Sequence, residues 1–241
     1  MSIIPNKHAD NNDPCKQVAR FMEVIFEPRD LVEVRMFPNK GEKRRPLQEW
    51  HRASVLPAQT NRLAEINAGG QNIYFGANPR CTEGGRTEHV ARARCLYVDF
   101  DNGVTVPASR LWIDDACLPV PTAIVFSGHG VQPWWRLDEA LTDLPEWTAR
   151  QKGLIQLLGS DPVVHDPPRV MRLPGFRNHK QPAADAVLIE ADPRRTYPLE
   201  EFPNGIPIRK ERSTSQAVAS ATTLLLPPID AMIEQHAGRA R

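Results

Sequence analysis

Residues 95–101 read Cys95-Leu96-Tyr97-Val98-Asp99-Phe100-Asp101, and this stretch decides the fold. Its apolar residues alternate with a tyrosine and two aspartates, and this period of two predicts a β-strand with one buried face and one polar face. Carboxylates at positions i and i+2 of one face lie about 7 Å apart along the backbone. Like charges this close raise each other's pKa unless a cation neutralises them. We therefore expect Asp99 and Asp101 to hold Mg²⁺ or Mn²⁺, which prefer oxygen ligands, although two acids on a strand can also simply face water.

The composition is that of an ordinary globular protein. The chain has 241 residues, of which 41% are hydrophobic and 24% are charged, so it is long enough to bury a core. Its net charge of +1 leaves no overall basic field, and any contact with nucleic acid must come from a local patch. The cysteines form no Cys-x-x-Cys pair, no apolar run reaches membrane-spanning length and no signal peptide is visible. These features predict a cytoplasmic protein without a membrane segment.

The patterns along the chain predict one α+β domain with tails. Mixed helices and strands joined by hairpins favour a mainly antiparallel sheet flanked by helices. Asp13-Pro14 is typical of a helix start, and Asp143 with Glu146 resembles a capping box. The expected helices are 13 to about 28, 59–68 and 143–159, and the expected strands are 31–37, 72–76, 95–101, 122–127, 131–137 and 187–189. The expected organisation is a disordered N-terminus at 1–12, a folded domain at 13–203, a linker at 204–223 and the start of a helical segment at 224–241.

A second element, Ser127-Gly128-His129-Gly130, stands where one expected strand turns into the next. Glycines on either side of His129 let backbone N–H groups approach a ligand closely, and Ser127 adds a hydroxyl. Such a turn suits a polyphosphate, while an ordinary glycine-rich hairpin is the alternative. The following Trp134 and Trp135 point to opposite faces of their strand, so at most one of them can stack on a base.

A third element spans residues 165–180 and carries a local surplus of positive charge. Its cations stand beside a single acid, Asp166, and prolines and a glycine restrict the path of its backbone. This combination fits a metal-bound triphosphate, because the acid can complete a metal site while the cations hold phosphate oxygens. The alternative is a solvated loop with scattered ion pairs. The cations are Arg169, Arg172, Arg177 and Lys180.

These three elements, in this order and spacing, resemble the archaeo-eukaryotic primase superfamily, in particular the primase-polymerases of plasmids and phages and the RepB-type plasmid primases. Residues 169–180 are similar to the family's Arg-x-x-Arg-Leu-Pro-Gly-x-x-Asn-x-Lys stretch, and residues 72–80 resemble a strand and turn that often precede the D-x-D strand. The resemblance covers about residues 20–203. It implies an RRM-like catalytic core within 13–203.

The resemblance also implies a function. The expected activity is that of a DNA primase or DNA-directed polymerase, a nucleotidyltransferase that synthesises primers on single-stranded DNA in plasmid, phage or mobile-element replication. The expected partners are the template, NTP or dNTP, and a helical accessory module or helicase. By the resemblance, Asp99, Asp101 and Asp166 are the catalytic ligands of two Mg²⁺ or Mn²⁺ ions, and the nucleotide is bound by Ser127, His129, Gln132, Arg169, Arg172, Asn178 and Lys180.

Several alternatives remain open in the sequence. Many family members place the histidine of the second motif after the glycine, where this chain has Gln132. We expect His129 to fill that role from within the turn, with Gln132 as the alternative. A metal-dependent nuclease would also use clustered carboxylates, and a non-catalytic replication-initiator module would bind DNA without them. A zinc site built from Cys81, His89 and Cys95 would lack any paired ligand motif.

Overall fold

The computed structural model describes residues 13–39 and 41–205. The expected disordered N-terminus, the linker from residue 206 onward and the expected helical segment at 224–241 lie outside these ranges. Within them, none of the helices combines the length and apolar character needed to cross a membrane.

Two mainly antiparallel sheets form the frame of the α+β fold. In the first sheet, neighbouring strands follow the order β2-β1-β3-β7, and all of its pairings are antiparallel. In the second sheet, β10, β5 and β6 are neighbours, β4 pairs with β6, and β11 joins β6 in parallel. The strands of the first sheet are β1 (Leu31–Phe37), β2 (Leu47–Arg52), β3 (Asn72–Gly76) and β7 (Val170–Arg172). Those of the second are β4 (Ala93–Tyr97), β5 (Ala123–Phe126), β6 (Val131–Leu141), β10 (Val187–Ala191) and β11 (Thr196–Tyr197).

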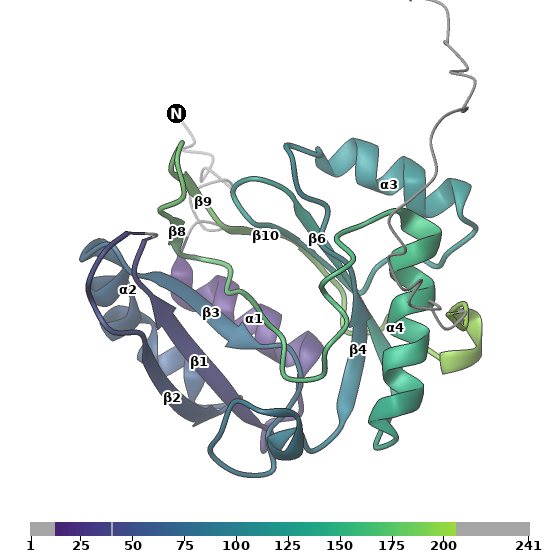
Figure 1. Ribbon diagram of the computed structural model, residues 1–241, viewed down its shortest axis with the longest axis horizontal. Coiled ribbons are helices and arrows are strands. Elements are labelled where there is room, and N and C mark those ends of the chain that lie inside the picture. Colours follow the sequence, from purple (N-terminus) through teal and green to yellow (C-terminus); the bar gives the residue numbers. More distant parts are fainter. Residues whose placement is uncertain (1–12, 40, 206–241) are drawn as a thin grey trace, which may run out of the picture. The chain divides into compact units, whose positions relative to one another are not determined.

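Three of the four α-helices lie close to where the sequence predicts, and α3 was not predicted. The Asp13 side chain caps α1 by accepting from the Cys15 N–H at 2.9 Å. The Asp143 side chain does the same for α4 with the Glu146 N–H at 3.0 Å. The α-helices are α1 (Pro14–Ile25), α2 (Thr60–Ala68), α3 (Val106–Asp115) and α4 (Leu144–Leu158), the short 3-10 turns are η2 (Leu56–Gln59), η3 (Thr87–His89) and η4 (Leu199–Glu201), and a hairpin is formed by β8 (Arg177–Asn178) and β9 (Ala184–Asp185). In Figure 1, β1 and β3 lie on one side of the fold and β4 and β6 on the other.

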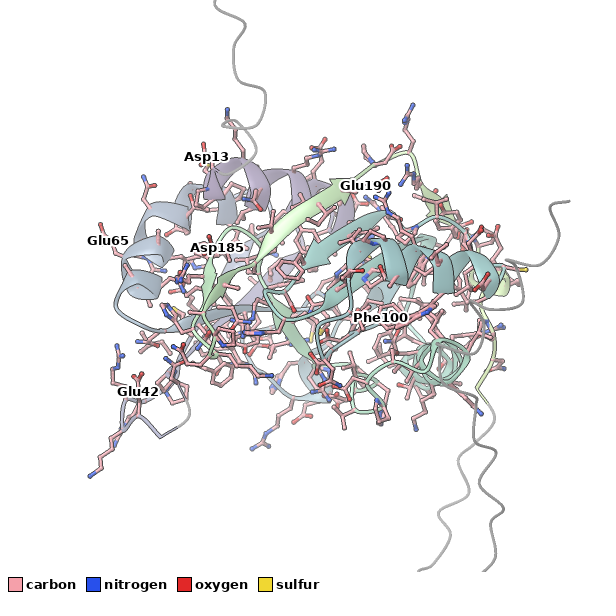
Figure 2. All side chains as sticks on the ribbon, turned by 90° about the horizontal axis from the view of Figure 1, so that it is seen from above. Asp13, Glu42, Glu65, Phe100, Asp185 and Glu190 are labelled. Carbon is pink, nitrogen blue, oxygen red and sulfur yellow. The ribbon has the colours of Figure 1, made fainter. Side chains whose placement is uncertain are left out.

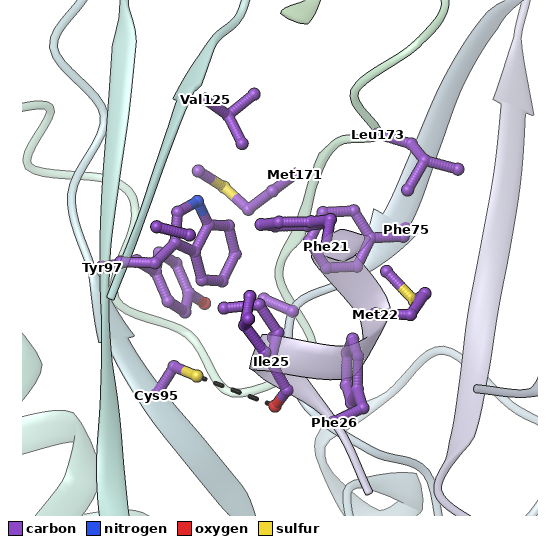
Figure 3. Close-up of a cluster of buried hydrophobic side chains, with 14 of the residues drawn as sticks. Phe21, Met22, Ile25, Phe26, Phe75, Cys95, Tyr97, Val125, Met171 and Leu173 are labelled. Carbon is purple, nitrogen blue, oxygen red and sulfur yellow. Dashed lines mark hydrogen bonds between the residues drawn. The ribbon is translucent and has the colours of Figure 1, made fainter. Parts of the chain in front are cut away.

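An aromatic cluster joins α1 to both sheets (Figure 3). The fully buried Trp134 of β6 lies 5.6 Å from Phe21 of α1, 5.5 Å from Phe75 of β3 and 4.4 Å from Tyr97 of β4, measured between ring centroids. Trp135, on the other face of β6, is also fully buried. Neither tryptophan is therefore available to stack on a base.

The strand of the D-x-D stretch is shorter than the sequence predicts. Strand β4 ends at Tyr97 instead of reaching Asp101. Beyond it, the Val98 N–H donates to the carbonyl of Pro133 at 3.2 Å, but a proline has no N–H to return the bond, so the ladder is interrupted. Backbone pairing resumes for one residue at Phe100, which exchanges two 2.9 Å hydrogen bonds with Val131. The two aspartates therefore lie just past the regular strand.

Replacing Trp134 tests the aromatic cluster. Trp134→Ala should lower the free energy of unfolding by about 3–5 kcal/mol, because the cavity it leaves is lined by rings from α1 and both sheets. Leu111→Ala is the control: Leu111 is 63% exposed on α3, so its loss should change stability by less than about 0.5 kcal/mol. Urea denaturation followed by circular dichroism measures both values, and equal losses would contradict the central role of Trp134.

Candidate active site

A pocket of about 170 Å³ lies where the end of β4, the β5–β6 turn, β7 and β8 meet. Of the ten site residues predicted from the sequence, this pocket gathers eight, and Asp166 and Arg169 are the two that it does not include. Tyr74, Val170 and Met171 complete the lining. The eight predicted residues are Asp99, Asp101, Ser127, His129, Gln132, Arg172, Asn178 and Lys180.

Asp99 has the electrostatics of a cation ligand. Its Oδ2 accepts a hydrogen bond from Gln132 Nε2 at 3.2 Å, whereas its buried Oδ1 has no partner among the described residues. Burial raises the pKa of Asp99 to about 7, and the charges of Asp101 and Asp161 act in the same direction, against the hydrogen bond from Gln132. A buried carboxylate oxygen without a donor, next to other acids, fits a hard divalent cation such as Mg²⁺ or Mn²⁺.

Asp161, which the sequence patterns did not single out, lies next to Asp99 although it does not itself line the pocket. Its N–H donates to the carbonyl of Asp99 at 3.0 Å, and its charge acts on the Asp99 carboxyl. Its position two residues after Gly159 was the available signal for this acid. Gly159 ends α4 in a left-handed conformation, and the chain then returns toward the D-x-D segment. Among the described residues, no three side chains of His, Cys, Asp or Glu lie close enough together to hold a metal ion. The acids of this region would therefore have to move closer together when a metal ion binds.

Asp166 and Arg169 do not line the pocket. They form an ion pair with each other, and Arg169 also donates to the carbonyl of Val163. The charge of Asp166 acts on the buried hydroxyl of Tyr97, whose pKa is raised first by burial and second by this carboxylate. Asp166 is absent from the charges that raise the pKa of Asp99. The structure thus separates this pair from the other predicted site residues.

The β5–β6 turn approaches the D-x-D segment unusually closely. A Cβ atom at Gly130 would lie 1.9 Å from the carbonyl oxygen of Phe100, so only glycine allows this contact. The turn closes with a 2.9 Å bond from the Ser127 N–H to the Gly130 carbonyl. On its other side, Asn178 Nδ2 donates to the Ser127 carbonyl at 2.8 Å. Figure 2 marks Phe100, between the two acids, and Asp185 on β9, the partner of the strand that carries Asn178.

His129 and Gln132 face different parts of the pocket. Gln132 is 3% exposed and its amide donates to Asp99, so it acts on the acids. His129 is partly exposed in the turn, and its Nε2 lies 3.0 Å from the carbonyl of Lys180. The two candidates for the second-motif role are therefore separated by their contacts.

Among the cations predicted for the site, Arg172 is held by buried neighbours within the pocket wall. It is 8% exposed, its Nη1 donates to Asn72 Oδ1 at 3.0 Å and its Nη2 donates to the Tyr74 hydroxyl at 2.5 Å. Its guanidinium carbon also lies 4.4 Å from the centroid of the Tyr74 ring, directly across the β3–β7 pairing. Burial lowers the pKa of Arg172. The sequence patterns did not single out Tyr74. Its position between buried Ile73 and Phe75 was the available signal, because alternate residues of a strand point to opposite faces.

The three residues of the possible zinc site do not come together. Cys95 is fully buried beside α1, where its Sγ lies 3.8 Å from the carbonyl of Ile25, and burial raises its pKa to about 12 (Figure 3). His89 uses its Nδ1 to accept from the Arg86 N–H, and Cys81 is exposed. Among the described residues, these three side chains therefore do not form a group that could hold a metal ion.

The raised pKa of Asp99 predicts a pH dependence of stability in the absence of metal. Asp99 titrates near pH 7 in the folded protein and near 3.8 when unperturbed, so the folded state binds more protons between these values. Stability should therefore fall as pH rises from about 4 to 8, by on the order of 2–4 kcal/mol. Asp99→Asn keeps an acceptor for Gln132 and should flatten this slope.

Thermal unfolding of both proteins across that pH range, with EDTA and then with Mn²⁺, measures the effect. Mn²⁺ should stabilise the unsubstituted protein more at about pH 8 than at about pH 5.5, because it competes with the proton for the same carboxylate. Identical pH slopes for the two proteins would contradict the assignment.

Comparison with known proteins places this site in a family. The family model of the RepB DNA-primase N-terminal domain matches residues 51–213. A curated protein of Clostridium perfringens named Replication protein is 25% identical over 155 residues, which cover 59% of this chain and 37% of that protein. The chain thus spans little more than a third of that relative.

Solved structures share the fold. The archaeo-eukaryotic primase domain of the primase-polymerase from cyanophage S-2L matches with a TM-score of 0.64 and 19% identity, over 77% of this chain and 94% of that one. The catalytic domain of primase RepB′, solved in complex with initiator DNA, matches with a TM-score of 0.58 and 19% identity, over 76% and 87%. The fold is therefore that of these primase domains. Since the family model covers more than half of the chain, the protein belongs to the family of the RepB DNA-primase N-terminal domain.

Proposed function

We propose that this chain is a DNA-dependent primase-polymerase that synthesises primers on single-stranded DNA in the replication of a plasmid, phage or other mobile element. The observation that carries the proposal is the pocket itself. It combines two acids, one with a buried oxygen that has no donor among the described residues, with the firmly held Arg172 and a glycine-rich turn. Acids and cations in one pocket suit a nucleoside triphosphate bound with its metal ions.

The proposed chemistry is nucleotidyl transfer to a 3′-hydroxyl. Mg²⁺ or Mn²⁺ at Asp99 and Asp101 would supply Lewis-acid activation of the hydroxyl and neutralise charge on the departing pyrophosphate. Arg172 would bind phosphate oxygens without rearranging, because Asn72 and Tyr74 already fix its guanidinium. Gln132 would orient the Asp99 carboxylate through their hydrogen bond. A nuclease would also use the acids but would not need to hold a triphosphate.

We propose Asp161 as the third acid of the site in place of Asp166. Neither acid lines the pocket, but Asp161 donates its backbone N–H to Asp99 and acts on the Asp99 carboxyl, whereas Asp166 is paired with Arg169. An acid whose charge already raises the pKa of a neighbouring carboxyl gains most from a shared cation.

Primer synthesis on single-stranded DNA with labelled nucleotides and Mg²⁺ or Mn²⁺ tests the function and the third acid together. The unsubstituted protein should make primers, Asp161→Asn should reduce the rate by about 100-fold or more, as expected for a metal ligand, and Asp166→Asn should keep most of it. Both variants should stay folded, because each only removes a negative charge.

If the unsubstituted protein made no primers and nicked the DNA instead, the nuclease would be favoured. If it only bound DNA, the initiator module would be favoured. The opposite ranking of the two variants would restore Asp166.

Separate measurements of nucleotide binding and of metal dependence test whether His129 or Gln132 fills the second-motif role. His129→Ala should raise the dissociation constant for nucleotide about 10-fold, the value of one charge-assisted hydrogen bond to phosphate. Gln132→Ala should instead raise the Mn²⁺ concentration needed for half-maximal rate, since its amide contacts Asp99. Titration of nucleotide and metal against each variant measures both. If Gln132→Ala weakened nucleotide binding while His129→Ala had no effect, Gln132 would hold the role.

A further inference from the structure

The segment Gly76-Ala77-Asn78-Pro79-Arg80 begins at the last residue of β3, and none of its side chains lines the pocket. It nevertheless contains a deeply buried charged group. The Arg80 side chain has no exposed surface, and neither does Glu33 of β1, with which it pairs. Arg80 Nε and Nη2 donate to Glu33 Oε2 at 2.9 and 2.5 Å. Arg35 and Gln48 occupy Glu33 Oε1, so the buried carboxylate is fully paired.

Gly76 makes room for this pair. A Cβ atom at residue 76 would lie 2.8 Å from Arg80 Nη2 and 3.2 Å from Glu33 Cβ. The buried guanidinium therefore passes over the backbone of β3 at a point where any side chain would obstruct it.

The same segment binds three consecutive carbonyl groups of the loop that leads into β7. Asn78, which is fully buried, donates from Nδ2 to the Pro167 carbonyl at 3.0 Å. Arg80 Nη2 donates to the Pro168 carbonyl at 3.0 Å. The Ala77 N–H donates to the Arg169 carbonyl at 2.9 Å. Neither proline can be held through an N–H of its own, so their carbonyls are the available attachment points.

This loop leads directly into the cationic wall of the pocket. Strand β7 begins one residue after Arg169 and carries Val170, Met171 and Arg172 into the lining. The loop itself starts from Asp161, beside the D-x-D segment. Its path therefore sets the separation between the acids and Arg172.

We propose that Asn78 and Arg80 are positioning residues for nucleotidyl transfer: through the carbonyls of Pro167 and Pro168 they hold the loop that places Arg172 opposite the acids. Arg80 also neutralises the buried charge of Glu33, but a lysine at position 80 would be sufficient for that. A lysine lacks the planar fork that reaches Glu33 and the Pro168 carbonyl at once. The inference rests on the proposed primase activity.

The test uses Asn78→Ala and Arg80→Lys in the full chain, with Thr122→Ala as the matched control. Thr122 is also buried and donates to a backbone carbonyl, that of Arg195, at 2.7 Å, but it lies on no part of the pocket. The measurements are melting temperature, kcat and KM for nucleotide in primer synthesis, the dissociation constant for single-stranded DNA, and hydrogen exchange of peptides covering 163–172.

Both positioning variants should lower kcat about 10- to 100-fold, since a displacement near 1 Å at a reacting centre has an effect of this size. They should speed exchange in 163–172 and leave DNA affinity within about twofold. Thr122→Ala should lose comparable stability and keep its kcat. Unchanged kcat in a folded Asn78→Ala, equal loss in Thr122→Ala, or failure of both positioning variants to fold would each overturn the inference. Failure of the unsubstituted protein to make primers would reject the proposed function instead, while the exchange data would still report on the loop.

Discussion

The close approach of two backbones at Phe100 and Gly130 is the constraint on which the rest of the site depends. The paired hydrogen bonds between Phe100 and Val131 hold the end of the D-x-D segment against the β5–β6 turn. They form only because residue 130 has no side chain to strike the Phe100 carbonyl. With this contact in place, the acids on one segment and the glycine-rich turn on the other face a common space. Each element alone would be an ordinary loop.

The second condition is that opposite charges reach this space from different sheets. The acids follow β4 of the second sheet, whereas Arg172 comes from β7 of the first. The aromatic cluster around Trp134 holds the two sheets together through α1, and the buried Glu33–Arg80 pair anchors the loop that precedes β7. Burying charges is costly unless they are paired, and the Glu33 carboxylate is fully paired whereas that of Asp99 is not. The unpaired oxygen of Asp99 is therefore the atom at which we propose that a cation binds.

Local sequence signals predicted most elements because their causes are local. The helix starts at Asp13 and Asp143 result from capping side chains, and the stop at Gly159 results from a left-handed residue. The strands 31–37 and 72–76 were predicted from the alternation of residue types that is typical of a strand. Two of the longer elements were not predicted, in addition to the short strands β7, β8, β9 and β11 and the 3-10 turns. Strand β2 is a polar edge strand that pairs with β1 and buries little, and α3 carries exposed Leu111 and Trp112, so neither has a clean hydrophobic period.

The sequence by itself determined the α+β class and the family, because these depend on residue type, order and spacing. It also named ten site residues, of which eight line one pocket in the structure. Only the tertiary structure decided which acid stands beside Asp99, and that Gln132 contacts Asp99 whereas His129 lies in the open turn. It also decided that Asp166 and Arg169 pair with each other, and that Asn78 and Arg80 hold the loop before β7. The reason is physical: Asp161 and Asp166 lie close together in the sequence, and their spacing along the chain carries no information about which one the end of α4 returns to the D-x-D segment.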